Sequence, residues 1–106
     1  MSLADESPTE APKASPRDVS MLERELSGWA VFNDEGMQKL VKEYKFDTFA
    51  DAMVFVNKVG KIAEDFGHHP EITFTWGRAT VRWWSHSMGG LTRNDFIMAA
   101  KTDTVK

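Results

Sequence analysis

The sequence predicts an α+β domain in which three helices lie on one face of a four-stranded antiparallel sheet, in the order α-β-β-α-β-β-α. Two observations indicate this fold. Apolar residues recur every three or four positions in three segments, as in helices, whereas four other segments are β-prone or alternate in polarity. These segments follow one another as helix, two strands, helix, two strands, helix, an order that suits an antiparallel sheet covered by helices.

The chain has 106 residues, a length that suits one domain. Its formal net charge of −3 argues against a general nucleic-acid binder. It has no cysteine, which excludes disulfides, thiolate catalysis and cysteine metal sites. We see neither an apolar run long enough to span a membrane nor a secretory signal. We therefore expect a soluble cytoplasmic protein, with the nucleus as a second location and with no membrane or direct nucleic-acid partner.

Residues 1–15 are rich in Ser, Pro, Ala, Glu and Asp and hold few apolar residues. Such a segment cannot bury enough surface to offset the entropy lost on ordering, so we predict a flexible N-terminal tail. Residues 16–106 are predicted to form the single domain. Its first helix begins with Ser15 as N-cap and Pro16 at the first helical position. The apolar face of that helix holds Val19, Leu22 and Leu26.

The first pair of strands follows this helix. Residues 28–32 are β-prone, and turn-forming residues occupy positions 33–36. Residues 37–46 are ambiguous, because their apolar positions fit one face of a helix as well as an imperfect alternation. We favour a strand that pairs back on the first.

A long helix is predicted next, with Asp47 or Thr48 as its cap and its end near Phe66. Its apolar stripe is wider than one small core requires. The stripe consists of Phe49, Met53, Val54, Phe55, Val56, Val59, Ile62, Ala63 and Phe66. Two interpretations remain open: part of the stripe faces another subunit, or the helix packs on two sides within one domain.

The second pair of strands is predicted over residues 71–76 and 80–86, with a turn at residues 76–78. Thr92 is predicted to cap the last helix, with Asp95 in its first turn. Two of the four tryptophans, Trp76 and Trp83, share strand faces with aliphatic residues and are expected in the core. Trp84 shares its predicted face with His86, so it either lines a pocket there or serves packing alone.

All three histidines lie at the ends of this second hairpin. His68 and His69 precede its first strand, and His86 ends its second. Because a hairpin returns the chain to the edge from which it started, we expect the three imidazoles to gather around one pocket. Glu64 and Asp95 are nearby acids that can orient an imidazole.

The residues alone leave three interpretations of the cluster open. Histidines can transfer protons near neutral pH, can bind a metal, or can simply make structural hydrogen bonds at strand ends. Adjacent residues in an extended chain point in opposite directions, so His68 and His69 would not easily hold one ion together. This argument counts against the metal site.

Over about residues 16–104, the chain resembles the pterin-4a-carbinolamine dehydratase family. The likeness is carried by His68-His69-Pro70-Glu71 and, at the distance that the family uses, by Ser85-His86. Further matching positions are Gly28-Trp29, residues 44–49, Ala63-Glu64, Phe74, Trp76, Val81 and residues 90–95. Three positions depart from the family's usual residues: Ile72, Trp84 and Ser87. Of these, Trp84 lies beside the predicted pocket.

The resemblance implies a reaction in which 4a-hydroxytetrahydrobiopterin loses water to give quinonoid dihydrobiopterin, with no metal and no organic cofactor. It implies that His68 and His86 transfer protons and that His69 chiefly holds the pterin. Glu64 and Asp95 would orient imidazoles or bond the pterin. The remaining predicted pocket residues are Trp29, Trp84, Gly67 and Ser85.

A homodimer or homotetramer is the expected assembly. The main competing hypothesis is a non-catalytic interaction protein or transcriptional cofactor that keeps the same fold and uses the long helix, as some animal relatives do. Metal-dependent hydrolysis is a third hypothesis. A direct assay for dehydration of the carbinolamine separates the first hypothesis from the other two.

Overall fold

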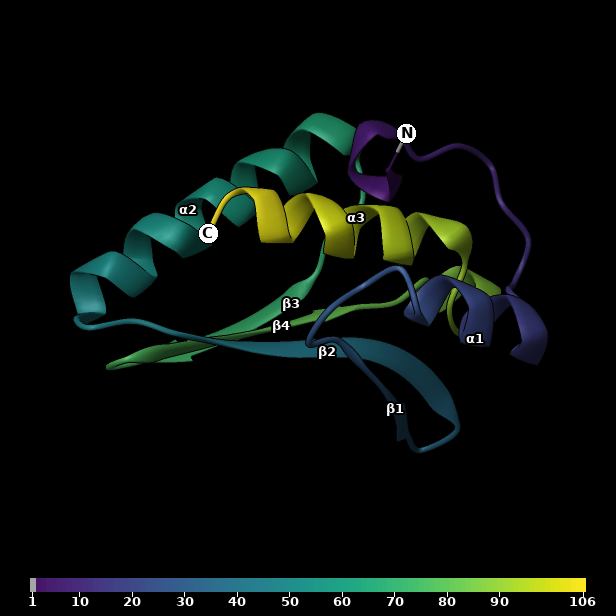
Figure 1. The fold of residues 1–106 in the computed structure, drawn as a ribbon, viewed down its shortest axis with the longest axis horizontal. Helices are drawn as coiled ribbons and strands as arrows, with labels where there is room; N and C mark the ends of the chain where they lie inside the picture. The colour runs from purple at the N-terminus through teal and green to yellow at the C-terminus, as the bar shows by residue number, and fades with distance from the viewer. Residues whose placement is uncertain (1) are drawn as a thin grey trace.

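The computed structural model describes residues 2–106. Its elements, in chain order, are η1 (Leu3–Asp5), α1 (Pro16–Glu23), β1 (Ala30–Asp34), β2 (Met37–Lys45), α2 (Phe49–Phe66), β3 (Glu71–Thr75), β4 (Arg78–Trp83), η2 (His86–Met88) and α3 (Arg93–Thr104). The α-helices all lie on the same side of the sheet (Figure 1). The predicted α+β fold and element order are therefore confirmed. None of the described helices is long and apolar enough to cross a membrane.

The four strands form one antiparallel sheet in the order β1-β2-β4-β3. Each hairpin pairs its own two strands, and β2 and β4 join the hairpins at the centre of the sheet, where Leu40 lies opposite Trp83. The ambiguous segment after the first turn is thus a strand, as favoured from the sequence, and not a helix.

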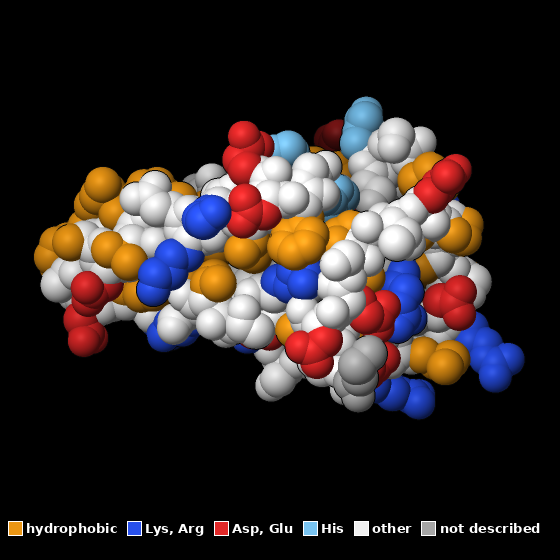
Figure 2. Space-filling view, turned by 90° about the horizontal axis from the view of Figure 1, so that it is seen from above, with side chains coloured by type: hydrophobic (Ala, Val, Ile, Leu, Met, Phe, Trp, Pro, Cys, Tyr) orange, Lys and Arg blue, Asp and Glu red, His pale blue; other side chains and the backbone are white. Residues whose placement is uncertain are grey.

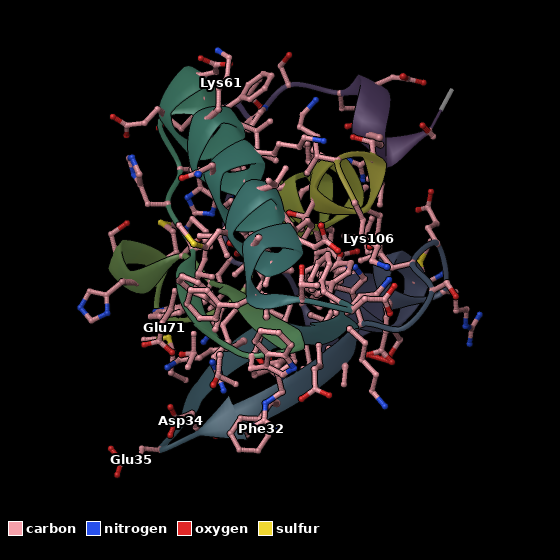
Figure 3. The ribbon with its side chains drawn as sticks, turned by 90° about the vertical axis from the view of Figure 1, so that its left-hand side faces the viewer. Phe32, Asp34, Glu35, Lys61, Glu71 and Lys106 are labelled. Atoms are coloured by element: carbon pink, nitrogen blue, oxygen red, sulfur yellow. The ribbon has the colours of Figure 1, made fainter. Side chains whose placement is uncertain are left out.

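The core lies between the sheet and the helices. Alternate residues of the central strands point toward the helices, and Leu40, Val81 and Trp83 are completely buried there. They belong to one apolar cluster with helix residues that include Phe55, Val59, Ala63, Phe96, Ile97 and Met98. The other face of the sheet is not covered by the helices (Figure 1). Phe32 on β1 is 56% exposed, and it lies at the opposite end of the molecule from Lys61 on α2 (Figure 3).

The ends of α2 fix where the histidines emerge. The Thr48 hydroxyl accepts the backbone N–H of Asp51 at 3.0 Å, so Thr48 is the N-cap. At the other end, Gly67 adopts a left-handed conformation with φ of 67°, and its N–H donates to the carbonyl of Ala63. This glycine ends the helix and directs the chain through His68 into β3.

The second hairpin is shorter than predicted. β4 ends at Trp83, whereas the strand was predicted to continue to His86. Ser85 and Gly90 pair with each other instead, and the N–H of Ser85 donates to the carbonyl of Gly90 at 2.9 Å. This pairing closes a tight loop, so His86 lies in the short helical turn η2. Trp76 lies in the turn between β3 and β4 and is 68% exposed, so its predicted place in the core is wrong.

Residues 2–15, for which the sequence predicts a flexible tail, lie against α3 (Figure 1). Leu3 in η1 is only 3% exposed. Lys13 forms an isolated antiparallel bridge with Thr92, just before α3 begins. The boundary between tail and domain at residue 16 stays a prediction.

Candidate active site

His68 lies immediately after the glycine that ends α2, and its ring faces the start of α3. Its Nε2 is 2.6 Å from Oδ1 of Asp95. The imidazole also stacks on the buried indole of Trp83, with ring centroids 5.5 Å apart and planes 25° apart. The His68 side chain remains 21% exposed. One edge of the ring is therefore fixed by a carboxylate and one face by an aromatic ring, while part of the side chain stays accessible.

Asp95 is completely buried in the first turn of α3. Its Oδ2 accepts the hydroxyl of Ser85 at 2.8 Å and the backbone N–H of Thr92 at 2.9 Å, while Oδ1 faces His68. Both carboxylate oxygens are thus engaged, as a buried carboxylate requires. The result is a chain of hydrogen bonds from Ser85 through Asp95 to His68.

His69 is the next residue, but its partner lies elsewhere. Its Nε2 contacts Oε2 of Glu64 in the last part of α2. Both side chains are exposed, at 61% for His69 and 78% for Glu64. A pair this open to water contributes little to stability. Its two groups are accessible to a ligand at the end of α2.

His86 is exposed in η2, beyond the end of β4. The pairing of Glu71 with Arg82 places the start of β3 beside the end of β4, so His69 and His86 lie near the same end of the hairpin. Figure 2 shows histidine side chains, in pale blue, toward one edge of the helix-covered face. Among the described residues, no three His, Cys, Asp or Glu side chains are grouped so that they could hold a metal ion.

The predicted tryptophans differ in position. Trp84 is half-buried, and its ring is covered by the Lys39 ammonium, whose Nζ lies 4.0 Å from the ring centroid. Trp29 is 6% exposed, and its indole N–H donates to Oδ2 of Asp103 at 3.1 Å. Asp103 follows Asp95 by eight positions on α3, a separation of about 12 Å along the helix axis. The structure therefore does not bring Trp29 to the carboxylate that faces His68.

Asp103 is the centre of a second polar cluster that sequence reasoning missed. Besides Trp29, it accepts Nζ of Lys42 at 2.8 Å and the hydroxyl of Tyr44. Burial, followed by the hydrogen bond to Asp103, raises the pKa of the Tyr44 hydroxyl far above its usual range. The partners are 59 to 74 positions apart in the chain. No local spacing could have indicated this cluster.

Two clefts lie away from the histidines. A cleft of about 390 Å³ lies beside the start of α2 and is lined by residues that include Lys45, Phe46 and Lys106. A second cleft of about 440 Å³ lies between the N-terminal segment and α1, where Lys13 and Met21 line it. Neither cleft is lined by a residue of the predicted histidine pocket.

A sequence model of the family described as pterin 4 alpha carbinolamine dehydratase matches residues 12–105. A protein of Chlorobium limicola is 51% identical over 85 residues, which cover 80% of this chain and 75% of that protein. A protein of Syntrophotalea carbinolica is 44% identical over 95 residues, which cover 90% and 85% respectively. Both are provisionally named pterin-4-alpha-carbinolamine dehydratases.

Two solved structures are also similar. One is described as a transcriptional coactivator/pterin dehydratase from Brucella melitensis, with a TM-score of 0.81, 28% identity, and coverage of 88% of this chain and 97% of that one. The other is a pterin dehydratase-like protein identified as a RuBisCO assembly factor in the alpha-carboxysome. Its TM-score is 0.62 at 20% identity, with coverage of 74% of this chain and 89% of that one, and it is similar in fold alone.

Fold and relatives together define a protein of the pterin dehydratase type. The chain belongs to the pterin 4 alpha carbinolamine dehydratase family. The resemblance inferred from the histidine block is thereby confirmed at the level of the family.

Proposed function

We propose that this protein dehydrates 4a-hydroxytetrahydrobiopterin to quinonoid dihydrobiopterin and water, in the cytoplasm and as a step of tetrahydrobiopterin recycling. The observation that carries the proposal is the hydrogen-bonded chain Ser85–Asp95–His68, which holds an accessible imidazole against a buried carboxylate. Family membership supports the pterin as the substrate class. The proposal needs no metal and no organic cofactor, because the reaction only moves protons and releases water.

The elimination requires a proton delivered to the leaving 4a-hydroxyl and a proton removed from a ring nitrogen of the pterin. In the proposed arrangement, the Nε2–H of His68 donates to Asp95, so its Nδ1 is left to exchange a proton with the substrate. His86, exposed near the same end of the hairpin, handles the second proton. Each positioned group of this kind contributes roughly 10²–10⁴-fold to a rate.

The other predicted residues have supporting roles. His69 and Glu64, paired and exposed at the end of α2, are proposed to hold the polar edge of the pterin. Gly67 supplies the turn and nearby backbone groups, and Ser85 holds Asp95. Trp84 is proposed to offer a ring surface at the margin of the site once Lys39 moves aside.

A direct assay tests this proposal. A hydroxylase generates the carbinolamine, and its disappearance is followed by absorbance with and without the protein. We expect faster disappearance with the protein, and a loss of roughly 10²-fold or more in the folded variants His68→Ala and His86→Ala. The proposal fails if the protein does not accelerate the reaction, or if both variants keep full activity.

A second candidate function is a non-catalytic interaction protein or transcriptional cofactor. The observation that favours it is the outer face of α2, where Phe49, Met53 and Val54 are 39%, 45% and 53% exposed. The printed description of the Brucella melitensis relative names a coactivator beside a dehydratase. We propose that in this chain the face serves a homodimer or homotetramer. If this chain had no dehydration activity but bound a partner protein through this face, that result would support the interaction role instead.

A further inference from the structure

The N-terminal segment contacts each of the four residues that precede Asp95. The first two contacts use the backbone. The N–H of Ala14 donates to the carbonyl of Leu91 at 2.8 Å, and Lys13 pairs with Thr92 as an isolated antiparallel bridge. Thr92 is itself bonded to the Asp95 carboxylate through its backbone N–H.

The next two contacts use side chains of the first turn of α3. The Arg93 guanidinium donates through Nε and Nη2 to the two carboxylate oxygens of Glu6, at 2.9 and 2.7 Å. Such a two-point contact fixes orientation as well as distance. Asn94 makes a reciprocal pair with the backbone of Thr9: its Oδ1 accepts the N–H at 3.1 Å, and its Nδ2 donates to the carbonyl at 2.6 Å.

The beginning of the segment is anchored farther along α3. Leu3 is buried to 3% exposure, and Nζ of Lys101 donates to the carbonyl of Ala4 at 2.7 Å. The same ammonium lies 4.5 Å from the ring centroid of Phe66, the last residue of α2 before the turn into His68. The segment is therefore connected to α3 directly and to the end of α2 through Lys101.

These contacts lie largely outside the part of the chain that matches the family. The match begins at residue 12, so Leu3, Glu6 and Thr9 precede it. The segment therefore adds contacts to a domain that the family match already covers. Four of these contacts, made by Glu6, Thr9, Lys13 and Ala14, converge on one short stretch, residues 91–94, which leads directly into Asp95.

We propose that residues 2–14 form an N-terminal strap that positions Asp95, and through it His68, for the reaction. Glu6 and Asn94 are positioning residues in this arrangement and do not touch the substrate. The inference rests on the proposed function, because it concerns the same histidine. Its physical basis is that Asp95 holds His68 through a single hydrogen bond, so a small rotation of the first turn of α3 displaces the imidazole. A displacement of about 1 Å at a reacting group can cost roughly 10²-fold in rate.

Two variants test the strap in the full domain. One deletes residues 2–10, and the other is Asn94→Ala, which removes both bonds to Thr9. The control is Glu10→Gln, which removes an exposed charge from the same segment. For each folded variant we measure kcat and KM for the carbinolamine, and the ring-nitrogen NMR signals of His68 with labelled histidine.

We expect both strap variants to lower kcat, the deletion by roughly tenfold or more, with KM unchanged and with shifted His68 ring signals. Glu10→Gln should leave all three quantities unchanged. If the deletion does not fold, Asn94→Ala decides the question. Unchanged kcat and unchanged His68 signals in a folded strap variant overturn the proposal, even if the melting temperature falls.

The NMR measurement also separates this proposal from the proposed function. His68 signals that shift in a protein without dehydration activity would refute the dehydratase assignment and retain the strap. Suppose instead that the wild type is active and that the strap variants keep their kcat and their His68 signals. That result would retain the dehydratase assignment and refute the strap.

Discussion

Asp95 has partners from three different parts of the chain, and each of them limits where its carboxylate can lie. The variant Asp95→Asn keeps the size of the side chain but replaces one acceptor oxygen with a donor. Because Ser85 and Thr92 both donate to Oδ2, the amide oxygen takes that place and the amide N–H faces His68. Nε2 of His68 must then accept a hydrogen bond, which puts the ring proton on Nδ1, so Nδ1 can no longer accept a proton from the substrate. We expect kcat for carbinolamine dehydration to fall roughly 10²-fold or more, measured in the absorbance assay on folded protein.

The matched control for this variant is Asp103→Asn on the same helix. Asp103 also accepts three hydrogen bonds, but from Trp29, Lys42 and Tyr44. We expect this variant to lose roughly 1–3 kcal/mol of stability, because partly buried donors lose their acceptor, and to keep its kcat. Equal losses of activity in the two variants would contradict a special role for Asp95.

Tyr44 gives a prediction about pH, and it is the only tyrosine in the chain. Its pKa in the folded protein is raised above the ordinary value of 10 by burial and then by Asp103. A group with a raised pKa stabilises the fold fully below its unfolded pKa, and this contribution is lost as the pH rises. Above pH 10, the unfolded chain releases the phenolic proton and the folded chain does not.

The free energy of unfolding should therefore fall by roughly 1.4 kcal/mol for each pH unit above 10 because of this residue. Urea unfolding of the wild type and of Tyr44→Phe at pH 8 and pH 11 measures the effect as a difference between the two proteins, which cancels the titration of lysines. Tyrosinate absorbance should also appear only on unfolding. Ionisation of Tyr44 in the folded protein near pH 10 would refute the prediction.

Individual residues also show what could and could not be predicted from the sequence. The histidine block and Asp95 were recognisable through the family resemblance, whereas the residues alone left three interpretations of the histidines open. The hydrogen bond of the Trp29 indole could not be predicted, since its partner Asp103 lies 74 positions away. Trp76 continues the alternation of the apolar residues Ile72 and Phe74, yet it lies one position past the end of β3. The turn there directs its side chain outward.

Among the helices and strands, local rules predicted where the helices begin, but not where α1 ends: it stops at Glu23, whereas Leu26 was predicted to lie on its apolar face. Thr92 was predicted as a cap, and Thr48 was one of two candidates beside Asp47, because a short polar side chain can bind the free N–H groups of a first turn. The end of β4 was missed because strand propensity continues through Trp84, whereas the pairing of Ser85 with Gly90 takes the chain out of the sheet. No single residue in the sequence indicates that Ser85 pairs with Gly90.

Two glycines, one inside α2 and one directly after its end, should respond to alanine with opposite signs. A Cβ added at Gly60 or Gly67 would meet no other part of the protein within 4 Å, so steric contact does not decide the outcome. Gly60 lies inside the helix, where alanine should add about 0.5–1 kcal/mol of stability. Gly67 has φ of 67°, where alanine should remove about 1–2 kcal/mol.

Chemical denaturation of the two variants measures both changes. Gly89→Ala is the matched control for Gly67→Ala, because it is also left-handed with open space around it, with φ of 76°, but lies in the loop after η2. The Gly67 and Gly89 variants should lose similar stability. A stabilising Gly67→Ala would mean that the end of α2 is not fixed by the left-handed turn that leads to His68.

At the scale of the whole molecule, the helices cover one face of the sheet, and the wide stripe of α2 is only partly used within the chain. Ala52, Phe55, Val59 and Ala63 are buried, whereas Phe49 and Met53 stay exposed. The sequence predicted the width of the stripe but could not choose between two packed sides and a subunit interface. Figure 2 shows apolar side chains, in orange, gathered at the end of the molecule where α2 begins. This exposed apolar surface favours a subunit interface over two packed sides within one domain.

The assembly is therefore predicted to depend on α2. Met53 lies one helical turn after Phe49, so Met53→Glu places a charge in the middle of the exposed apolar face. Burying an unpaired carboxylate is strongly unfavourable, so the variant should sediment as a monomer while the wild type sediments as a dimer or tetramer. Phe32→Glu is the control, because Phe32 is also exposed and apolar but lies on β1. A monomeric wild type would refute the interface, and an oligomer broken by Phe32→Glu but not by Met53→Glu would move it to the open face of the sheet.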